Sequence, residues 1–281
     1  MPKNDFRTGK ETIMKTKRKL LLPLFAIAIS FLLSGCVNKP LEDLRLSWAL
    51  TKKYGEIFIV ADSFVGSASW IDVGSLEAVC YPLSDKNLTF KVSYSIKNQK
   101  LNGDKYAEAI VREEAYEEME QILSQHYTDF ILDANACHSM IQYDEMSKYT
   151  KFTNMEDVSI SSYEEKYGEK MIISFYIGFN AEEIDNYEEA EPIFKEYCEK
   201  FNDGRVNFFC YYMNSEDIDK CKKLEETDYW DNYNSCDLIN KSENRTEYVY
   251  RYMEKEFFLS SIISNDGVQR FNSDGTPESE E

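Results

Sequence analysis

The stretch LTFKVSYSI, residues 88–96, and the stretch DKYAEAIVREEAYEEMEQILSQHY, residues 104–127, decide the fold class of this chain. In the first stretch apolar and polar residues alternate, which is the period of a half-buried β-strand. In the second stretch apolar residues recur at helical spacing, and most glutamates fall on the opposite side. The turn signal Asn102-Gly103 separates the two. Strand, turn and long amphipathic helix together predict a helix laid across a small antiparallel sheet.

The predicted buried faces of these two elements follow from their periods. The glutamates of the helix, Glu108 among them, are expected to face solvent for the most part. The apolar face of the strand consists of Leu88, Phe90, Val92, Tyr94 and Ile96. The apolar stripe of the helix consists of Tyr106, Ile110, Met119, Ile122, Leu123 and His126, continuing to Phe130.

Segments of both periods flank this pair of elements. A helix is expected at 41–54, where Leu41, Leu44, Trp48 and either Ala49 or Leu50 share one face that we expect to be buried, and Gly55 would end it. Further helices are expected at 184–201 and after an N-cap at Ser215. Strands are expected at 56–65, 130–132, 158–163, 171–179 and 206–213, with a turn at 133–139 and a hairpin formed by 246–253 and 257–264. The whole pattern predicts an α+β fold in which amphipathic helices pack on antiparallel sheets.

The domain organisation is expected to divide within the polar segment 143–154. We predict α+β subdomains at 41–150 and 151–266, followed by a disordered acidic tail at 267–281. The sequence Lys53-Tyr54-Gly55-Glu56 is repeated at residues 166–169, each time before an apolar run. Duplication of one subdomain and two uses of the same turn chemistry both explain this repeat. One domain and two similar subdomains therefore both remain open.

Residues 14–36, MKTKRKLLLPLFAIAISFLLSGC, have the layout of an export signal. A basic region precedes the apolar run from Leu20 to Leu33, and small residues lead into Cys36. The run has 14 residues, whereas a helix that spans a membrane needs about 20. We therefore expect residues 1–35 to be removed. Residues 1–13 contain Asp5 and Glu11, which an export signal normally lacks at this place, so we expect translation to start at Met14.

The ending Leu33-Ser34-Gly35-Cys36 resembles the lipobox of bacterial lipoproteins. This resemblance implies a diacylglyceryl thioether on the Cys36 sulfur and cleavage between Gly35 and Cys36. It also implies a location on the extracytoplasmic face of the cell membrane, with residues 36–40 as a short tether. Two acyl chains are enough for stable anchoring. The alternative is an ordinary secretory signal followed by an unmodified cysteine.

The body of the chain is acidic. Removal of residues 1–35, with seven basic and two acidic side chains, changes the net charge from −19 to −24. Such a charge repels phosphate backbones, so we expect no nucleic-acid partner. The membrane, through the lipid anchor, and a protein or small ligand of unknown identity are the expected partners. Around residues 53–56 the body also resembles uncharacterised lipoproteins of low-GC Gram-positive bacteria.

Six cysteines lie beyond Cys36, and export permits disulfides among them. Local bridges Cys198–Cys210 and Cys221–Cys236 are plausible because these four residues lie close together in the chain. Buried reduced thiols explain the same cysteines equally well. No CxxC pair occurs in the sequence, so neither a thioredoxin-like centre nor a four-cysteine zinc site is indicated.

Catalytic motifs are absent from the sequence, which has no GxSxG, HExxH, Walker or dinucleotide-binding pattern. His126 is expected to pack on the helical stripe, and His138 follows Cys137 too closely for the two side chains to face each other from one strand. The loop at 228–237 mixes acids, amides and aromatics without the ordered ligands of an EF-hand. We expect no cofactor and no metal. The leading hypothesis is a non-enzymatic binding or envelope-interaction module; the alternatives are an envelope hydrolase with a carboxylate-based site and an uptake-system binding protein.

Overall fold

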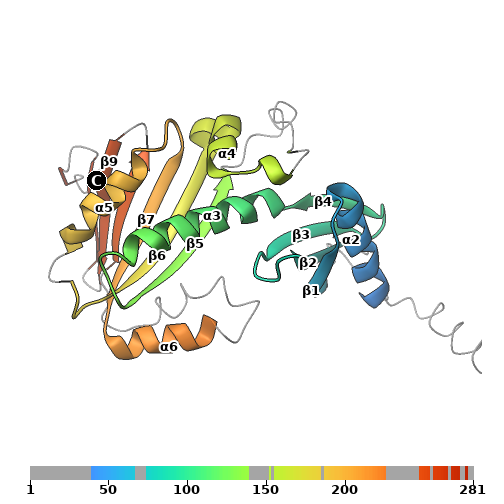
Figure 1. The fold of residues 1–281 in the computed structure, drawn as a ribbon, viewed down its shortest axis with the longest axis horizontal. Coiled ribbons are helices and arrows are strands. Elements are labelled where there is room, and N and C mark those ends of the chain that lie inside the picture. The colour runs from blue at the N-terminus through green and yellow to red at the C-terminus, as the bar shows by residue number, and fades with distance from the viewer. Residues whose placement is uncertain are drawn as a thin grey trace, which may run out of the picture.

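The structure is a computed structural model that describes residues 39–66, 74–138, 152, 155–184, 187–225, 247–253, 256–264, 267–272 and 276–277. Within these residues the chain forms two β-sheets and five α-helices (Figure 1). The two sheets lie side by side along the long axis of the molecule, and one helix runs from the first sheet onto the second. The predicted α+β class is therefore confirmed.

The small sheet is an antiparallel meander of strands in the order β1-β2-β3-β4. The strand that the alternating pattern predicted is β3, and its Phe90, Val92 and Tyr94 are buried as expected. Helix α2 covers one face of this sheet. The bounds are α2 Lys39–Tyr54, β1 Phe58–Gly66, β2 Ser75–Pro82, β3 Phe90–Ser95 and β4 Lys100–Asp104.

Aromatic rings fill the centre of the small core. Tyr106 packs against Phe58 with ring centroids 5.1 Å apart and against Phe90 at 4.8 Å. Tyr54, the last residue of α2, lies 5.0 Å from the same ring. Edge and tilted contacts of this kind stabilise a core beyond the area that they bury. Because Tyr106 belongs to the next helix, the small core is completed from outside its own sheet.

The buried face of α2 differs from the one that the sequence predicted. Leu46 and Leu50 face the sheet, whereas Leu41, Leu44 and Trp48 are exposed. Both sets have helical spacing, so periodicity by itself does not decide which set packs. The sheet selects the Leu46 face because the Ser47 hydroxyl donates a hydrogen bond of 2.6 Å to the backbone carbonyl of Phe58.

The large sheet has the strand order β10-β9-β8-β7-β6-β5. Its β6–β7 pair is parallel, and the other pairs are antiparallel. A parallel pair needs a crossover connection, which α5 provides between β6 and β7. The bounds are β5 Phe130–His138, β6 Met171–Asn180, β7 Arg205–Met213, β8 Glu247–Met253, β9 Glu256–Ser264 and β10 Gly267–Arg270. The predicted strands at 171–179 and 206–213 and the predicted hairpin are confirmed.

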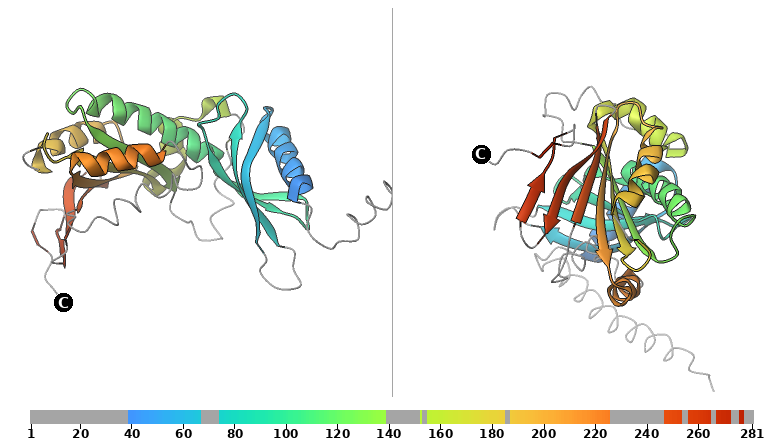
Figure 2. Two further views of the ribbon diagram at one scale, coloured as in Figure 1. Left: turned by 90° about the horizontal axis from the view of Figure 1, so that it is seen from below. Right: turned by 90° about the vertical axis from the view of Figure 1, so that its left-hand side faces the viewer.

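Helices lie on both faces of the large sheet (Figure 2). Helices α3, α4 and α5 cover one face and enclose the main core, whose residues include Met119, Phe175 and Phe208. Helix α6 covers the other face, where Ile218 packs in a smaller cluster with Tyr211. The bounds are α3 Tyr106–Leu123, α4 Ile160–Tyr167, α5 Glu191–Cys198 and α6 Ser215–Glu225.

Helix α3 belongs to both cores. Its first turn places Tyr106 and Ala109 in the small core. The following turns place Val111, Ala115 and Met119 in the main core. The predicted long helix is thus confirmed, and its two differently directed sets of buried residues reflect its contact with two sheets.

The predicted division of the chain near residue 150 does not match this arrangement. Strand β5 lies before that point and β6 after it, yet the two pair over nine positions from Phe130↔Phe179 to His138↔Met171. The sheets divide instead where β4 ends and α3 begins. The segment 139–151 itself lies outside the described residues.

Three local predictions are wrong. Residues 133–138, expected to turn, continue strand β5, because β6 offers them a full row of backbone partners. Residues 160–163, expected in a strand, begin α4, because the Ser159 and Ser162 hydroxyls form a reciprocal capping box. Residues 267–270, expected in a disordered tail, form β10 by pairing with the edge strand β9.

The repeated Lys-Tyr-Gly-Glu sequence has the same local role at both places. Gly55 follows α2 with φ of +82°, and Gly168 follows α4 with φ of +53°. Such positive φ values at a helix C-terminus favour glycine, which carries no Cβ. Each glycine directs the chain into a strand, β1 in one case and β6 in the other. The surrounding sheets differ in strand number and direction, so shared turn chemistry accounts for the repeat.

Two leucines of α2 test which face of the helix packs. Leu50 is 0% exposed and Leu44 is 68% exposed. We predict that Leu50→Ala lowers the free energy of unfolding by about 2–5 kcal/mol, because it removes buried methyl groups and leaves a cavity. Leu44→Ala is expected to change it by less than about 0.5 kcal/mol. Urea unfolding of both variants measures this, and a larger loss for Leu44→Ala would contradict the packing.

Candidate functional site

A group of ionisable and aromatic side chains lies where α3, β5 and α4 meet. We call Glu108, His138, Tyr163 and Tyr167 the histidine cluster. His138 is the last residue of β5, and Glu108 stands in the first turn of α3. Tyr163 and Tyr167 are four residues apart on α4 and therefore project from one side of it. The helix α3 and the β5–β6 pairing thus bring together residues that are far apart in the sequence.

Polar contacts connect His138 to both helices. The Nδ1 atom of His138 lies 2.9 Å from the hydroxyl of Tyr163 and 3.5 Å from Oε1 of Glu108. The ammonium group of Lys105 donates to the same Glu108 oxygen at 3.1 Å. Glu108 is only 8% exposed. Its predicted position on the solvent face of the helix is therefore wrong, and the reason is that α3 meets β5 and α4 on that side.

Aromatic rings enclose the imidazole. The ring of Tyr167 stacks on His138 with centroids 4.5 Å apart and an interplanar angle of 7°. Phe152 stacks on Tyr163 at 6.0 Å. The ammonium nitrogen of Lys166 lies 3.8 Å from the centroid of the Phe152 ring, a cation–π contact.

Burial sets the protonation states of this cluster. Desolvation lowers the pKa of His138 below its usual value, and Lys105 adds to this shift while Glu108 opposes it. Burial also raises the pKa of Tyr167 to about 12 and raises the pKa of Tyr163. The imidazole and both phenols are therefore neutral at pH 7, and the Lys105–Glu108 ion pair carries the charge of the site.

The geometry of the histidine cluster favours a structural role, in which it holds α3, β5 and α4 together, over a catalytic role. Cys137 is the nearest thiol in sequence, but neighbouring strand residues point to opposite faces, and burial raises its pKa. The thiolate that a nucleophile requires is thereby disfavoured. His138 already contacts Tyr163 and Glu108 through Nδ1. In the described part of the chain, no three His, Cys, Asp or Glu side chains are grouped so as to hold a metal ion.

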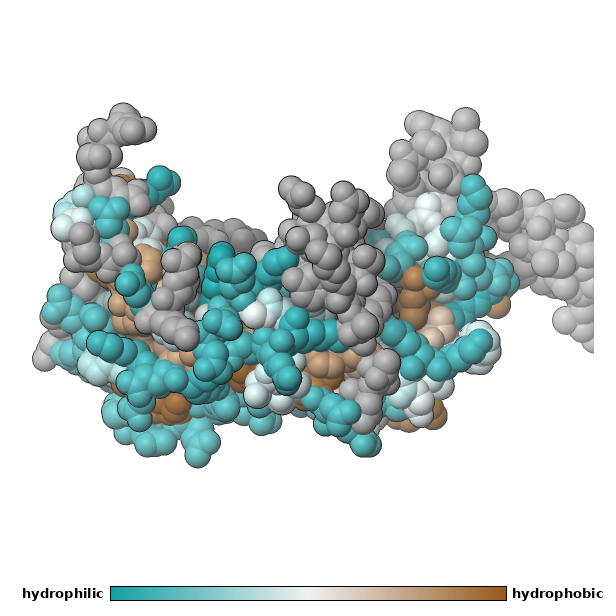
Figure 3. Space-filling view, turned by 90° about the horizontal axis from the view of Figure 1, so that it is seen from above, coloured by the Kyte–Doolittle hydropathy of each residue, from teal (hydrophilic) through white to brown (hydrophobic). Residues whose placement is uncertain are grey.

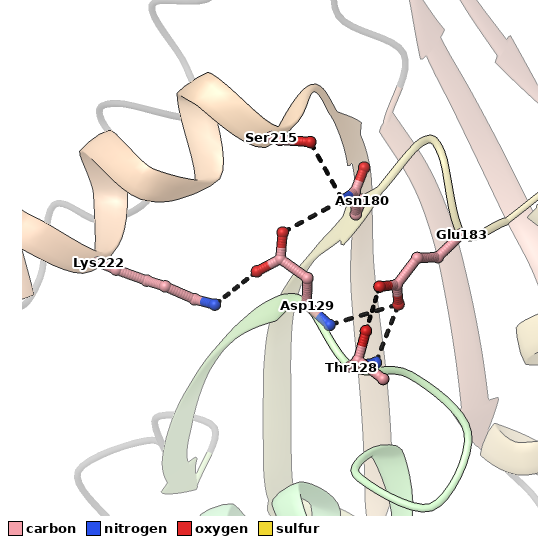
Figure 4. A network of polar contacts seen from close by, with 6 residues as sticks. All are labelled: Thr128, Asp129, Asn180, Glu183, Ser215 and Lys222. Carbon is pink, nitrogen blue, oxygen red and sulfur yellow. Dashed lines mark hydrogen bonds and ion pairs between the residues drawn. The ribbon is translucent and has the colours of Figure 1, made fainter.

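A second polar network joins the loops beside β5, β6 and α6 (Figure 4). Asp129 accepts hydrogen bonds from Lys222 at 2.6 Å and from Asn180 at 3.1 Å. Glu183 accepts from the backbone N–H groups of Thr128 at 2.9 Å and Asp129 at 3.3 Å. Hydrogen bonds from Thr128 lower the pKa of Glu183. Every carboxylate in this network is used to hold a loop or a helix, so the network fixes α6 to the sheet.

Helix α2 presents an unusual surface. Leu41, Leu44 and Trp48 are 43%, 68% and 66% exposed, and they line one side of the helix. In the view of Figure 3 the described surface is mostly hydrophilic, and its hydrophobic areas are small and separate. A row of three exposed apolar residues along one helix differs from that pattern, and exposed apolar rows often mark contact surfaces.

The cysteines only partly follow the sequence prediction. In the structure Cys198 is a buried free thiol, which matches the reduced-thiol explanation that the sequence left open beside the Cys198–Cys210 bridge. Cys221 is buried, and its predicted partner Cys236 lies outside the described residues.

The other predicted positions are distributed as follows. Cys36 and the loop at 228–237 lie outside the described residues. His126, expected to pack, is exposed, because α3 ends at Leu123 and the following turn buries Tyr127 instead. The cap of α6 is Asn214 rather than Ser215, since the Asn214 side chain accepts from the backbone N–H of Asp217 at 2.9 Å. None of the described helices is long and apolar enough to cross a bilayer.

Comparisons with known proteins bear on the fold. No protein-family model and no curated protein matches the chain. The crystal structure of a DUF5037 family protein from Ruminococcus gnavus ATCC 29149 is similar, with a TM-score of 0.53 and 19% sequence identity. The likeness covers 76% of this chain and 93% of that chain. At this identity it shows a shared fold and carries no activity to this chain.

The histidine cluster makes a prediction about pH. Because the folded protein binds a proton at His138 less tightly than the unfolded chain, stability falls as the pH drops below about 6.5, the pKa of a free histidine. The contribution of one such group is at most about 1.4 kcal/mol per pH unit. We predict that His138→Phe, which keeps a ring on Tyr167, loses less stability between pH 7 and pH 5 than the wild type.

The control uses the other histidine of the chain. His126→Phe replaces an exposed histidine outside the histidine cluster and is the matched control for the substitution. Urea unfolding at pH 7 and at pH 5 gives the free energy of unfolding of the wild type and of both variants, and so the loss of stability of each protein between the two pH values. An equal loss of stability between pH 7 and pH 5 in His138→Phe and in the wild type would contradict the burial of a neutral imidazole.

Proposed function

We propose that this protein is a lipid-anchored lipoprotein of the extracytoplasmic face of a bacterial membrane, and that its body is a non-enzymatic binding module. The observation that carries the proposal is the sequence of residues 14–36, with its basic region, its short apolar run and Cys36 at the position of the lipidated cysteine. Its partner is an envelope protein or a small ligand, and the strong negative charge of the body disfavours nucleic acid.

The position of the folded body fits this proposal. Helix α2 begins at Lys39, so only residues 37 and 38 separate it from Cys36. A lipid on Cys36 would hold the body directly at the membrane surface. The anchor would be the source of membrane affinity for an otherwise acidic chain.

The use of the buried carboxylates favours binding over hydrolysis. Glycosidases act through two carboxyl groups that face each other across a cleft. Among the described residues, the acids buried as whole residues are Glu42, Glu108 and Glu164. The carboxylate of Asp104 is buried as well, and Lys53 donates to it at 2.6 Å. Glu42 pairs with Arg45 at 2.6 Å, and Glu108 pairs with Lys105.

Glu164 holds a loop of the large sheet. Its Oε1 atom accepts hydrogen bonds of 2.7–2.8 Å from three successive backbone N–H groups, those of Asn202, Asp203 and Gly204. Each of these four carboxylates thus binds a cation or a backbone loop, and no two of them pair as acid and base. Cleavage of an envelope polymer that single carboxylate changes abolish would instead support the hydrolase.

The anchor is tested by its chemistry. In a lipoprotein-processing bacterial host, we predict that the purified wild type lacks residues 1–35 and carries the mass of a diacylglyceryl group. Cys36→Ala is expected to lose that mass and to leave the membrane fraction or accumulate as precursor, and globomycin is expected to cause accumulation of the wild-type precursor. Cys137→Ala, which changes a half-buried thiol of the body, serves as the control and retains the lipid. A wild-type protein with an unmodified Cys36 would contradict the proposal.

A further inference from the structure

We propose that the exposed face of α2 lies on the anionic surface of the bilayer, so that α2 is an interfacial helix that docks the body on the membrane. This inference rests on the proposed function, since it places the helix beside the lipid on Cys36. It goes further by naming the docking surface and the chemistry that this surface recognises, which is a phospholipid headgroup layer.

The composition of the exposed face carries the inference. Besides Leu41, Leu44 and Trp48, the residues of α2 that are exposed are Lys39, Pro40, Lys52 and Lys53. Lys52 lies beside Trp48 on this face, whereas Lys39 pairs with Asp62 of β1 and Lys53 pairs with Asp104 of β4. The face is therefore apolar, with one lysine beside the tryptophan and no exposed acid of α2. In a chain with 51 acidic and 32 basic residues this is a marked local reversal of charge. Apolar side chains flanked by lysines are typical of helices that lie in the membrane interface.

The two acids near this face are turned away from it. Glu42 is buried and paired with Arg45. The carboxylate of Asp43 accepts a hydrogen bond of 2.6 Å from the hydroxyl of Ser63 in β1. Both contacts hold the negative charges on the protein side of the helix. The charge that remains beside the apolar row is that of Lys52, which suits anionic lipids.

Packing prevents α2 from turning its apolar row inward. Leu46 and Leu50 occupy the small core on the opposite side, and Ser47 is hydrogen-bonded to the backbone of β1. Lys39 forms an ion pair of 3.4 Å with Asp62 at the start of the helix. The exposed row is thus a fixed feature of the fold.

Trp48 occupies the middle of this face. The ammonium nitrogen of Lys52 lies 5.3 Å from the centroid of its ring. Tryptophan prefers the headgroup level of a bilayer, where its ring meets apolar and polar surroundings together. Trp48 and Lys52 therefore combine apolar contact with the acyl chains and attraction to the anionic headgroups.

The anchor limits where α2 can lie. Three residue steps join Cys36 to Lys39, and even a fully extended chain spans at most about 3.6 Å per residue. The start of α2 therefore stays within about 11 Å of the lipidated residue. Figures 1 and 2 place α2 at the end of the molecule away from the large sheet, so the headgroup layer can meet this face without meeting the large sheet.

Quenching of Trp48 fluorescence tests the docking. The full chain, processed by its host and bearing Trp70→Phe and Trp230→Phe, is reconstituted into phosphatidylcholine and phosphatidylglycerol vesicles with or without bromine on the acyl chains. Circular dichroism first establishes that the variant is folded. We predict that the brominated lipid reduces the emission of Trp48 about twofold, because the ring lies at the headgroup boundary. Equal emission in both kinds of vesicle would overturn the inference.

Matched substitutions locate the docking surface. Leu41→Ser combined with Leu44→Ser is expected to abolish most of the quenching. Val268→Ser changes an apolar side chain of similar exposure, 57%, on β10 of the large sheet, and it is expected to leave the quenching unchanged. An effect of Val268→Ser as large as that of the leucine changes would also overturn the inference.

The mass of the reconstituted protein separates this inference from the proposed function. An acylated chain whose Trp48 is not quenched overturns the docking and leaves the anchor intact. An unmodified chain whose Trp48 is still quenched overturns the anchor and supports the docking face. An unmodified chain without quenching overturns both. A stable dimer without vesicles that shields Trp48 would assign the face to a second copy and overturn the membrane docking.

Discussion

The fold depends on the sharing of α3 between two cores. Tyr106, in its first turn, completes the aromatic centre of the small sheet, and Met119, three turns later, is fully buried against the large sheet. A helix is stiff over this length, because a backbone hydrogen bond joins each residue to the residue four positions before it. The orientation of the small sheet on the large one therefore follows from one continuous element, and Glu108 and His138 add a polar contact at the same junction.

The sequence predicts those parts of the fold in which one residue pattern has one structural solution. The alternation in β3, the long helical pattern of α3 and the glycine after α2 are local signals of this kind. The face of α2 could not be predicted, because two apolar rows have helical spacing and only the sheet decides which one packs. The length of β5 depends on pairing with β6, which lies more than thirty residues later. The histidine cluster was missed for the same reason, since Glu108 looks like any other glutamate of the helix until β5 and α4 cover it.

The same geometry would connect the proposed lipid anchor to the body. Because α2 is fixed to the small sheet and the small sheet is fixed to α3, the large sheet would be held at a set distance and angle from a membrane on which α2 lies. The acidic body would then project from the surface on a short tether rather than move freely around it. This arrangement suits a binding module that presents one end to partners in the envelope.

Hydrogen exchange tests most directly whether α3 makes the two sheets one cooperative unit. Phe208→Ala weakens the main core, where the Phe208 ring stacks on Phe194 at 4.3 Å. If loss of the main core releases α3, the most protected amides of β1–β3 should lose protection by the same factor as those of β6 and β7. Unchanged protection in β1–β3, with loss confined to the large sheet, would contradict this account and make the small sheet an independent domain.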